Sequence, residues 1–197
     1  MIDNKIHQMI CSKFSLPEDS SSPLEVSFNR NELAAFFHEL GFSIGAEVGV
    51  SRGLYSEVLL KAIPGLVLYC IDPWEPYYET PSARKQRHVY QDAQNRLSAW
   101  PVKYIVKRSM GALADIADNS LDFVYIDANH DFEHASEDVP GWYKKVRKGG
   151  ILAGHDYTVF PRLNFGIIPA VNNFVEKNNL FLYLTTERYK SWFLVKK

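Results

Sequence analysis

A regular alternation of short apolar segments with longer amphipathic ones constrains how this chain folds more than any other feature of the sequence. The clearest apolar segments are residues 45–50 (GAEVGV), 66–71 (LVLYCI) and 121–126 (LDFVYI). They have the length of strands, whereas the segments between them carry apolar residues at helical spacing. Strands that alternate with helices pair in parallel, and helices cover both faces of the resulting sheet.

The pattern predicts seven strands and six helices. The strands are expected at 45–50, 66–71, 102–107, 121–126, 150–154, 180–185 and 191–195, and the helices at 29–40, 54–62, 82–99, 111–116, 133–147 and 168–178. The last two strands are close enough in sequence to form a hairpin, so this end of the sheet should be antiparallel. We therefore expect a doubly wound, mostly parallel α/β domain over residues 31–197, preceded by an N-terminal extension at 1–30 as a candidate substrate cover.

Length and composition fit one globular domain. The chain has 197 residues, 46% of them hydrophobic, and a formal net charge of −1, which gives no reason to expect a nucleic-acid or membrane partner. Its two cysteines, Cys11 and Cys70, cannot build a disulfide framework, and Cys70 is expected in the core. The N-terminus lacks the apolar stretch of a signal peptide, so we expect a cytoplasmic protein. The oligomeric state is open, with a homodimer as one option.

In doubly wound sheets ligands bind at the carboxyl ends of the strands, so the turn after the first predicted strand is the first candidate site. Gly49 and Gly53 allow a tight turn and a close ligand approach. Ser51 breaks the G-x-G-x-x-G pattern of dinucleotide sites. Glu47 would repel a diphosphate but attract an ammonium group. The turn therefore favours a ligand with a cationic amino-acid end, and an ordinary strand-to-helix turn with two glycines is the alternative.

The second predicted strand ends in IDPW. The carboxylate of Asp72 is placed to accept hydrogen bonds from both hydroxyls of a ribose, as the acidic residue does in dinucleotide folds. Trp74 is expected either against the ribose or adenine or as a cover for the core. A turn or cap residue is the alternative role of Asp72.

Acidic and histidine side chains follow the next two central strands. Asp127 ends one strand, His130 lies three residues on, and Asp156 follows the neighbouring strand. Two carboxylates and waters suit Mg²⁺, which could lower the pKa of a substrate hydroxyl. His130, with an ordinary pKa near 6.5, suits removal of that proton. Loop histidines bonded to backbone, and a structural turn acid, are the alternatives. Four further acids are expected at a solvated helix start: Asp131, Glu133, Glu137 and Asp138.

Three stretches together, AEVGVSRG, IDPW and FVYIDANHDFEHASEDVPGWYKKVRKGGILAGHDY, resemble the class I S-adenosylmethionine-dependent methyltransferases, in the branch related to macrocin O-methyltransferase. The resemblance spans residues 44–157 and implies a Rossmann-like sheet. It assigns the methionine end of the cofactor to the turn from Glu47 to Gly53. The other residues that it implies are Asp72 at the ribose, Ser109 and Met110 at the adenine, acids at Asp127 and Asp156 for a metal, and His130 as the base. Ser51, Trp74 and Asp127 are further candidates for contact with the cofactor, and Asp127 also for catalysis. His155 stands where metal-dependent relatives carry an acid or amide, which puts the metal in question.

The sequence therefore predicts methyl transfer from S-adenosylmethionine to a small-molecule hydroxyl. A non-catalytic domain that binds S-adenosylmethionine or S-adenosylhomocysteine and a nicotinamide-dependent oxidoreductase are the alternatives. The acceptor is expected to contact residues 1–30, 74–90 and 157–169. Aromatic side chains there could line a pocket for a flat or apolar acceptor or could equally cover the core, namely Tyr77, Tyr78, Tyr157, Phe160 and Phe165.

Overall fold

A computed structural model describes residues 4–76, 82–159 and 165–197 of the chain. Its strands are β1 (Leu24–Val26), β2 (Ile44–Val48), β3 (Val67–Ile71), β4 (Lys103–Ile105), β5 (Leu121–Ile126), β6 (Val146–Gly154), β7 (Leu182–Thr185) and β8 (Trp192–Val195). Its α-helices are α1 (Asn4–Phe14), α2 (Arg30–Glu39), α3 (Leu54–Ala62), α4 (Ala83–Arg96), α5 (Ser109–Ala112), α6 (Phe132–Lys145) and α7 (Ile167–Lys177), and a 3₁₀ turn follows α5 at Leu113–Asp115.

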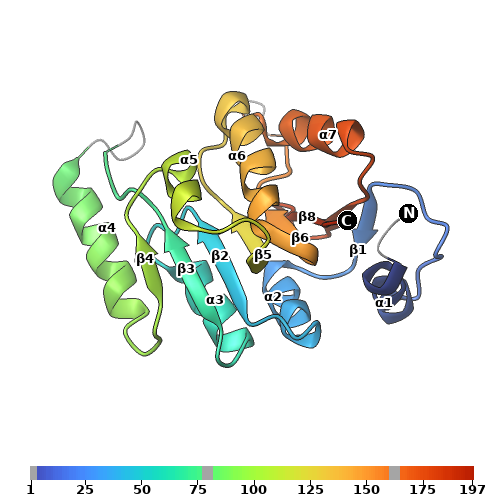
Figure 1. Ribbon diagram of the computed structural model, residues 1–197, viewed down its shortest axis with the longest axis horizontal. Coiled ribbons are helices and arrows are strands. Elements are labelled where there is room, and N and C mark those ends of the chain that lie inside the picture. The colour runs from blue at the N-terminus through green and yellow to red at the C-terminus, as the bar shows by residue number, and fades with distance from the viewer. Residues whose placement is uncertain (1–3, 77–81, 160–164) are drawn as a thin grey trace.

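The eight strands form one sheet in the order β1-β7-β8-β6-β5-β2-β3-β4 (Figure 1). Strand β8 runs antiparallel to both of its neighbours, and the other neighbouring strands pair in parallel. From β2 the chain builds outward to β3 and β4 and then returns to place β5 on the other side of β2. The direction of winding therefore changes between β2 and β5, and ligands of such sheets bind at the carboxyl ends of the strands at this point.

The predicted fold class is confirmed, including the antiparallel hairpin. The sheet has one strand more than the seven expected, because β1 pairs in parallel with β7. This three-residue strand has no periodicity of its own, and its place depends on that pairing. Helix α1 was also not predicted, and His7 fixes it to β7 through Nδ1, which lies 2.7 Å from the hydroxyl oxygen of Tyr183.

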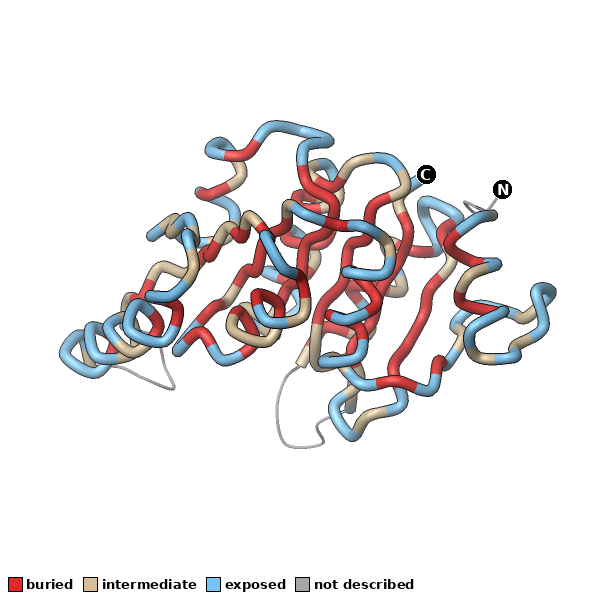
Figure 2. The backbone as a smooth tube through the Cα atoms, turned by 90° about the horizontal axis from the view of Figure 1, so that it is seen from below, coloured by how far each residue is buried: buried red, intermediate tan, exposed pale blue. Residues whose placement is uncertain are grey.

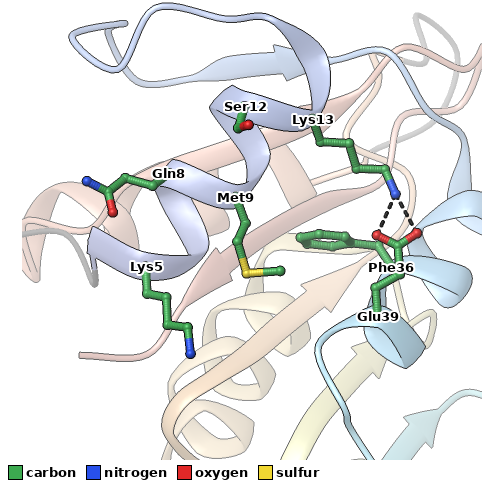
Figure 3. Close-up of a pocket in the computed structure, with 7 residues that line it drawn as sticks. All are labelled: Lys5, Gln8, Met9, Ser12, Lys13, Phe36 and Glu39. Atoms are coloured by element: carbon green, nitrogen blue, oxygen red, sulfur yellow. Dashed lines mark hydrogen bonds and ion pairs between the residues drawn. The ribbon is translucent and has the colours of Figure 1, made fainter.

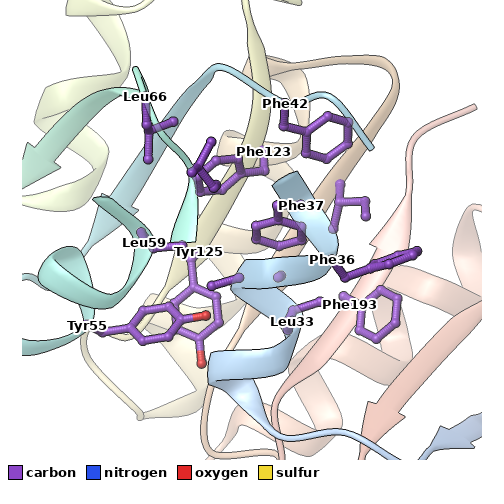
Figure 4. Close-up of a cluster of buried hydrophobic side chains, with 14 of the residues drawn as sticks. Leu33, Phe36, Phe37, Phe42, Tyr55, Leu59, Leu66, Phe123, Tyr125 and Phe193 are labelled. Carbon is purple, nitrogen blue, oxygen red and sulfur yellow. The ribbon is translucent and has the colours of Figure 1, made fainter. Parts of the chain in front are cut away.

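Helices cover both faces of the sheet. The buried side chains of α1, α2, α3 and α4 belong to one apolar cluster, and those of α5, α6 and α7 belong to the other. Figure 2 shows buried segments running through the middle of the molecule, with exposed segments at its outside. Phe37 of α2 stacks on Phe123 of β5 with ring centroids 4.6 Å apart (Figure 4). Gly45 of β2 leaves room for that ring, because a Cβ there would lie 2.3 Å from it.

No helix in the described parts of the chain combines the length and the apolar character that crossing a lipid bilayer requires.

Candidate functional site

The turn between β2 and α3 depends on its glycines. Gly49 has a φ of +93°, and a Cβ at this position would lie 1.9 Å from the carbonyl oxygen of Asp127. Ser51 has a φ of +50°, and Gly53, the residue immediately before α3, has a φ of +72°. The backbone of the turn is thus packed directly against the end of β5, and this contact joins two of the predicted site segments.

Asp72 holds this turn in place. Its carboxylate accepts hydrogen bonds from the backbone N–H groups of Ser51 (2.9 Å) and Trp74 (2.7 Å). The indole N–H of Trp74 donates to the Ser51 carbonyl at 2.9 Å. Trp74 is 7% exposed and its ring packs against Tyr90 and Tyr104, so it covers the core, one of its two expected positions. Burial raises the pKa of Asp72, although these backbone hydrogen bonds act in the opposite direction.

Glu47 is buried beneath the turn, with 2% of its surface exposed. The hydroxyl of Ser56 on α3 donates a hydrogen bond to its carboxylate. Burial raises the pKa of Glu47 to about 8, even though the Ser56 hydrogen bond lowers it. The group is therefore mostly protonated near neutral pH, whereas the sequence suggested a permanent negative charge. A cation bound nearby would favour its ionised form.

Ser109 and Met110 lie at the start of α5, and residues of α6 orient the serine. The Ser109 hydroxyl donates to Asp138 and accepts a hydrogen bond from the indole N–H of Trp142 at 2.8 Å. Met110 is 43% exposed. We expected Asp138 in a solvated helix start, and this was wrong: its side chain points inward from α6 and is buried. Burial raises its pKa to about 6, although the Ser109 hydrogen bond lowers it.

Asp127, His130 and Asp156 converge at the carboxyl ends of β5 and β6, as expected. Nε2 of His130 lies 3.0 Å from Asp156 Oδ2 and 3.6 Å from Asp127 Oδ1. Neither contact has the geometry of a hydrogen bond, and the buried Nε2 has no hydrogen-bond partner among the described residues. The ring stacks on Phe165 with centroids 4.6 Å apart. The nitrogen therefore lies between two carboxylates with its bonding capacity unused.

The two carboxylates change the proton affinity of His130. Burial by itself would lower the pKa of this histidine, but Asp127 and Asp156 outweigh that effect and raise it to about 9. The ordinary value near 6.5 that we assumed from the sequence is therefore wrong for this site. Burial would raise the pKa of Asp156, but its contacts with His130 and His155 hold it well below the ordinary value.

The same three side chains form a possible cation site. One ligand atom from each of Asp127, His130 and Asp156 lies within 4.8 Å of the others. Two carboxylate oxygens and an imidazole nitrogen form a mixed donor set that fits a divalent cation, and the unpartnered Nε2 supports that fit. Nδ1 of His155 instead lies 3.2 Å from Oδ1 of Asp156, so this histidine contacts a carboxylate of the group.

Sequence reasoning missed two residues of this site, Arg30 and Tyr55. Arg30 is the first residue of α2, and its Nη1 atom lies 3.8 Å from Oδ2 of Asp127. Its guanidinium also lies over the ring of Tyr55, 5.2 Å from the centroid. The sequence does mark Arg30 as the start of a helix, because Asn29 and Glu32 have the spacing of a capping box, which they form in the structure. No strand end points to Arg30, however, so its closeness to Asp127 depends on the packing of α2.

The segments expected to contact the acceptor are described only in part. Tyr77, Tyr78 and Phe160 lie outside the described residues. Tyr157 donates a hydrogen bond to Asn172 of α7. A groove between α1 and the second half of α2 is lined by Lys5, Gln8, Met9, Ser12, Lys13, Phe36 and Glu39 (Figure 3). Lys13 and Glu39 form an ion pair across this groove, and none of its lining residues belongs to the site above.

Comparison with protein families gives one clear match. A family model of a methyltransferase domain matches residues 46–157, which is more than half of the chain. Uncharacterized protein R132 of Acanthamoeba polyphaga mimivirus is 30% identical over 73 residues, 37% of this chain. The chain spans only 33% of the length of that curated relative.

Comparison with solved structures gives similar folds. The O-methyltransferase TomG of Streptomyces achromogenes, solved with SAM, is 20% identical at a TM-score of 0.64, covering 98% of this chain and 89% of TomG. An O-methyltransferase of Bacillus cereus, solved with SAH, is 15% identical at a TM-score of 0.57, covering 98% of this chain and 90% of its own. At these identities the likeness concerns the fold.

Proposed function

The chain belongs to the methyltransferase domain family that matches its residues 46–157, and on that premise we propose that it transfers the methyl group of S-adenosylmethionine to a hydroxyl oxygen of a small-molecule acceptor. The observation that carries this proposal is the contact between Gly49 and Asp127. It brings the turn expected to hold the methyl donor against the strand end that leads to His130. A donor site and a group that can take a proton thus lie side by side, as methyl transfer to an oxygen requires.

The donor site that we propose is built from the carboxyl ends of β2, β3 and β4, on one side of the point where the winding reverses. The backbone from Gly49 to Gly53 would receive the methionine end, and Asp72 the ribose hydroxyls. The two N–H groups bound to Asp72 leave its carboxylate with unused acceptor capacity. Ser109 would face the adenine, with its hydroxyl held by Asp138 and Trp142. Similarity to structures solved with SAM and SAH supports this assignment.

The chemistry that we propose needs little from the protein beyond alignment and removal of a proton. S-adenosylmethionine supplies a methyl group on a sulfonium. In the transfer the S–CH₃ bond breaks, its electron pair stays on sulfur, and an O–CH₃ bond forms. The neutral form of His130 takes the hydroxyl proton at Nε2, while Asp127 and Asp156 orient the ring and stabilise the imidazolium. Because its pKa is raised to about 9, the fraction of this neutral form, and with it the transfer rate, should grow as the pH rises toward that value.

A divalent cation is a further part of the proposal. Oxygens of Asp127 and Asp156 would hold it, which leaves Nε2 of His130 to take the proton, and it would act as a Lewis acid that lowers the pKa of the acceptor hydroxyl. A cation and a protonated His130 would compete for the same two carboxylates. We also propose a cytoplasmic location, in keeping with the free, buried state of both cysteines.

Calorimetric titration tests the donor, with S-adenosylmethionine and NADH as separate ligands. We expect heat and thermal stabilisation from S-adenosylmethionine alone. Binding of NADH alone would favour the oxidoreductase, and binding of neither would contradict the proposed donor.

The transfer step is tested with methyl-labelled S-adenosylmethionine and a panel of phenols and aliphatic alcohols, with Mg²⁺ or with EDTA. We expect transfer to fall at least about 100-fold in His130→Gln and to stay unchanged in His38→Gln, an exposed histidine of α2. Equal rates in wild type and His130→Gln would remove His130 as the base. Binding of the donor without transfer to any hydroxyl in the panel would favour a non-catalytic binding domain. Equal rates in Mg²⁺ and EDTA would remove the cation from the proposal.

A further inference from the structure

Arg30 is held rigidly beside the donor turn, although the function above gives it no role. Asn29 caps the helix that Arg30 begins, accepting hydrogen bonds from the N–H groups of Asn31 and Glu32. The hydroxyl of Tyr55, two residues after Gly53, donates to the Arg30 carbonyl at 2.8 Å. The backbone of Arg30 is therefore fixed both within its own helix and to the first turn of α3.

The guanidinium of Arg30 has unused hydrogen-bond donors. It lies over the ring of Tyr55, and its Nη1 atom is 3.8 Å from Oδ2 of Asp127, which is beyond hydrogen-bond distance. The structure gives the guanidinium no hydrogen bond to any described residue. Its side chain is 35% exposed. A planar group with five N–H donors is thus positioned by stacking, while its donors are free to bind a carboxylate in pairs.

The surroundings of Arg30 also carry negative charge. Asp127 and Glu187 each act electrostatically on Arg30, and Oδ2 of Asp127 lies 3.8 Å from its Nη1 atom. A partly exposed ion pair at 3.8 Å contributes little to stability, so holding α2 in place is a weak reason for this arrangement. The guanidinium of Arg30 and the carboxylate of Asp127 are close but not hydrogen-bonded to each other. Each can therefore bind the opposite charge of a ligand that carries an anionic and a cationic group side by side.

We propose that Arg30 binds the carboxylate of the methionine end of S-adenosylmethionine, while the carboxylate of Asp127 attracts the ammonium group. The inference rests on the proposed function. An α-amino acid carries its two opposite charges on one carbon, so one cationic and one anionic side chain in close proximity recognise it. Tyr55 links Arg30 to the helix that follows the donor turn, and Asp127 contacts the turn itself at Gly49. Both charges are therefore fixed to the turn assigned to the methionine end.

The test removes the carboxylate from the ligand and the guanidinium from the protein, separately and together. Calorimetry measures the affinities of wild type, Arg30→Gln and Arg30→Lys for S-adenosylmethionine and for its decarboxylated analogue. Lys144→Gln, which removes an exposed cation near the C-terminus of α6, is the control. We expect Arg30→Gln to weaken S-adenosylmethionine roughly 10- to 100-fold, the range of a charge-assisted hydrogen bond. The same variant should bind the decarboxylated analogue as wild type does, and Arg30→Lys should recover part of the loss.

The other results separate the possible failures. Equal weakening of both ligands by Arg30→Gln, or of neither, would overturn the assignment to the carboxylate. Unchanged donor affinity with a raised KM for the acceptor would instead assign Arg30 to an anionic acceptor and would also overturn it. If wild type binds neither ligand, the proposed function fails at an earlier step, which is a distinct result. Unfolding midpoints of all variants confirm that each affinity belongs to folded protein.

Discussion

Replacement of Glu47 by glutamine should remove a large pH dependence from the stability of this protein. Glu47 is buried with only the Ser56 hydroxyl donating to it, and its pKa is raised to about 8. A carboxyl group whose pKa is raised by folding stabilises the folded state while it is protonated. That stabilisation is complete below the unfolded pKa, near 4.5, and is lost as the pH rises through about 8.

The size of the effect follows from the two pKa values. Over most of the range from pH 5 to pH 8 the folded state keeps a proton that the unfolded state has already lost, so unfolding releases this proton and becomes more favourable as the pH rises. With a folded pKa of about 8, the contribution of Glu47 to the free energy of unfolding falls by roughly 3 to 4 kcal/mol over this range. A glutamine side chain at this position has nearly the same shape, can accept the Ser56 hydrogen bond and does not titrate, so it removes this pH-dependent contribution while leaving the packing in place.

The assay is urea unfolding of wild type and Glu47→Gln at pH 5, 6, 7 and 8. Other titrating groups affect both proteins equally, so the quantity of interest is the difference between their free energies of unfolding. We expect this difference to shift in favour of Glu47→Gln by roughly 3 to 4 kcal/mol from pH 5 to pH 8. Glu57→Gln is the control, because Glu57 lies on α3 and is paired with Lys61 and Arg96 at the surface, with a lowered pKa. Its difference from wild type should stay flat above pH 5. Parallel curves for wild type and Glu47→Gln would refute the reasoning.

Two further predictions concern how the site is built. Gly49→Ala should cost roughly 3 kcal/mol or more, because its Cβ would collide with the Asp127 carbonyl, whereas Gly65→Ala, which has positive φ but open space around it, should cost about 1 kcal/mol in the same denaturation assay. Similar losses in the two variants would argue against the close contact between the turn and β5. Ser109→Ala leaves Asp138 and Trp142 without their partner, so we expect a loss of roughly 2 to 4 kcal/mol, against less than about 1 kcal/mol for the exposed Ser120→Ala. A loss at Ser109 no larger than at Ser120 would contradict the buried network.

The sequence alone was sufficient for the order of the elements from α2 onward and for the strand ends that form the candidate site. Seven strands and six helices follow from local periodicity, because burial on one or both faces selects apolar residues at the spacing of the element. Parallel strands bring their carboxyl ends to one edge of the sheet. For that reason Asp127, His130 and Asp156 could be expected together from their places in the sequence.

Only the tertiary structure decided the protonation states of the site's acids and histidine, and which residues distant in the sequence lie beside them. Burial makes Glu47 mostly neutral, two carboxylates raise the pKa of His130 to about 9, and Asp138 turns inward from α6. Arg30 lies far from Asp127 in the sequence and comes close to it because α2 packs against the sheet beside α3. Such properties depend on the charges and the solvent excluded around each side chain in space. A linear sequence records the residue types but not those distances. It therefore predicts where the turn from Glu47 to Gly53 lies, whereas the charge of Glu47 depends on the folded structure.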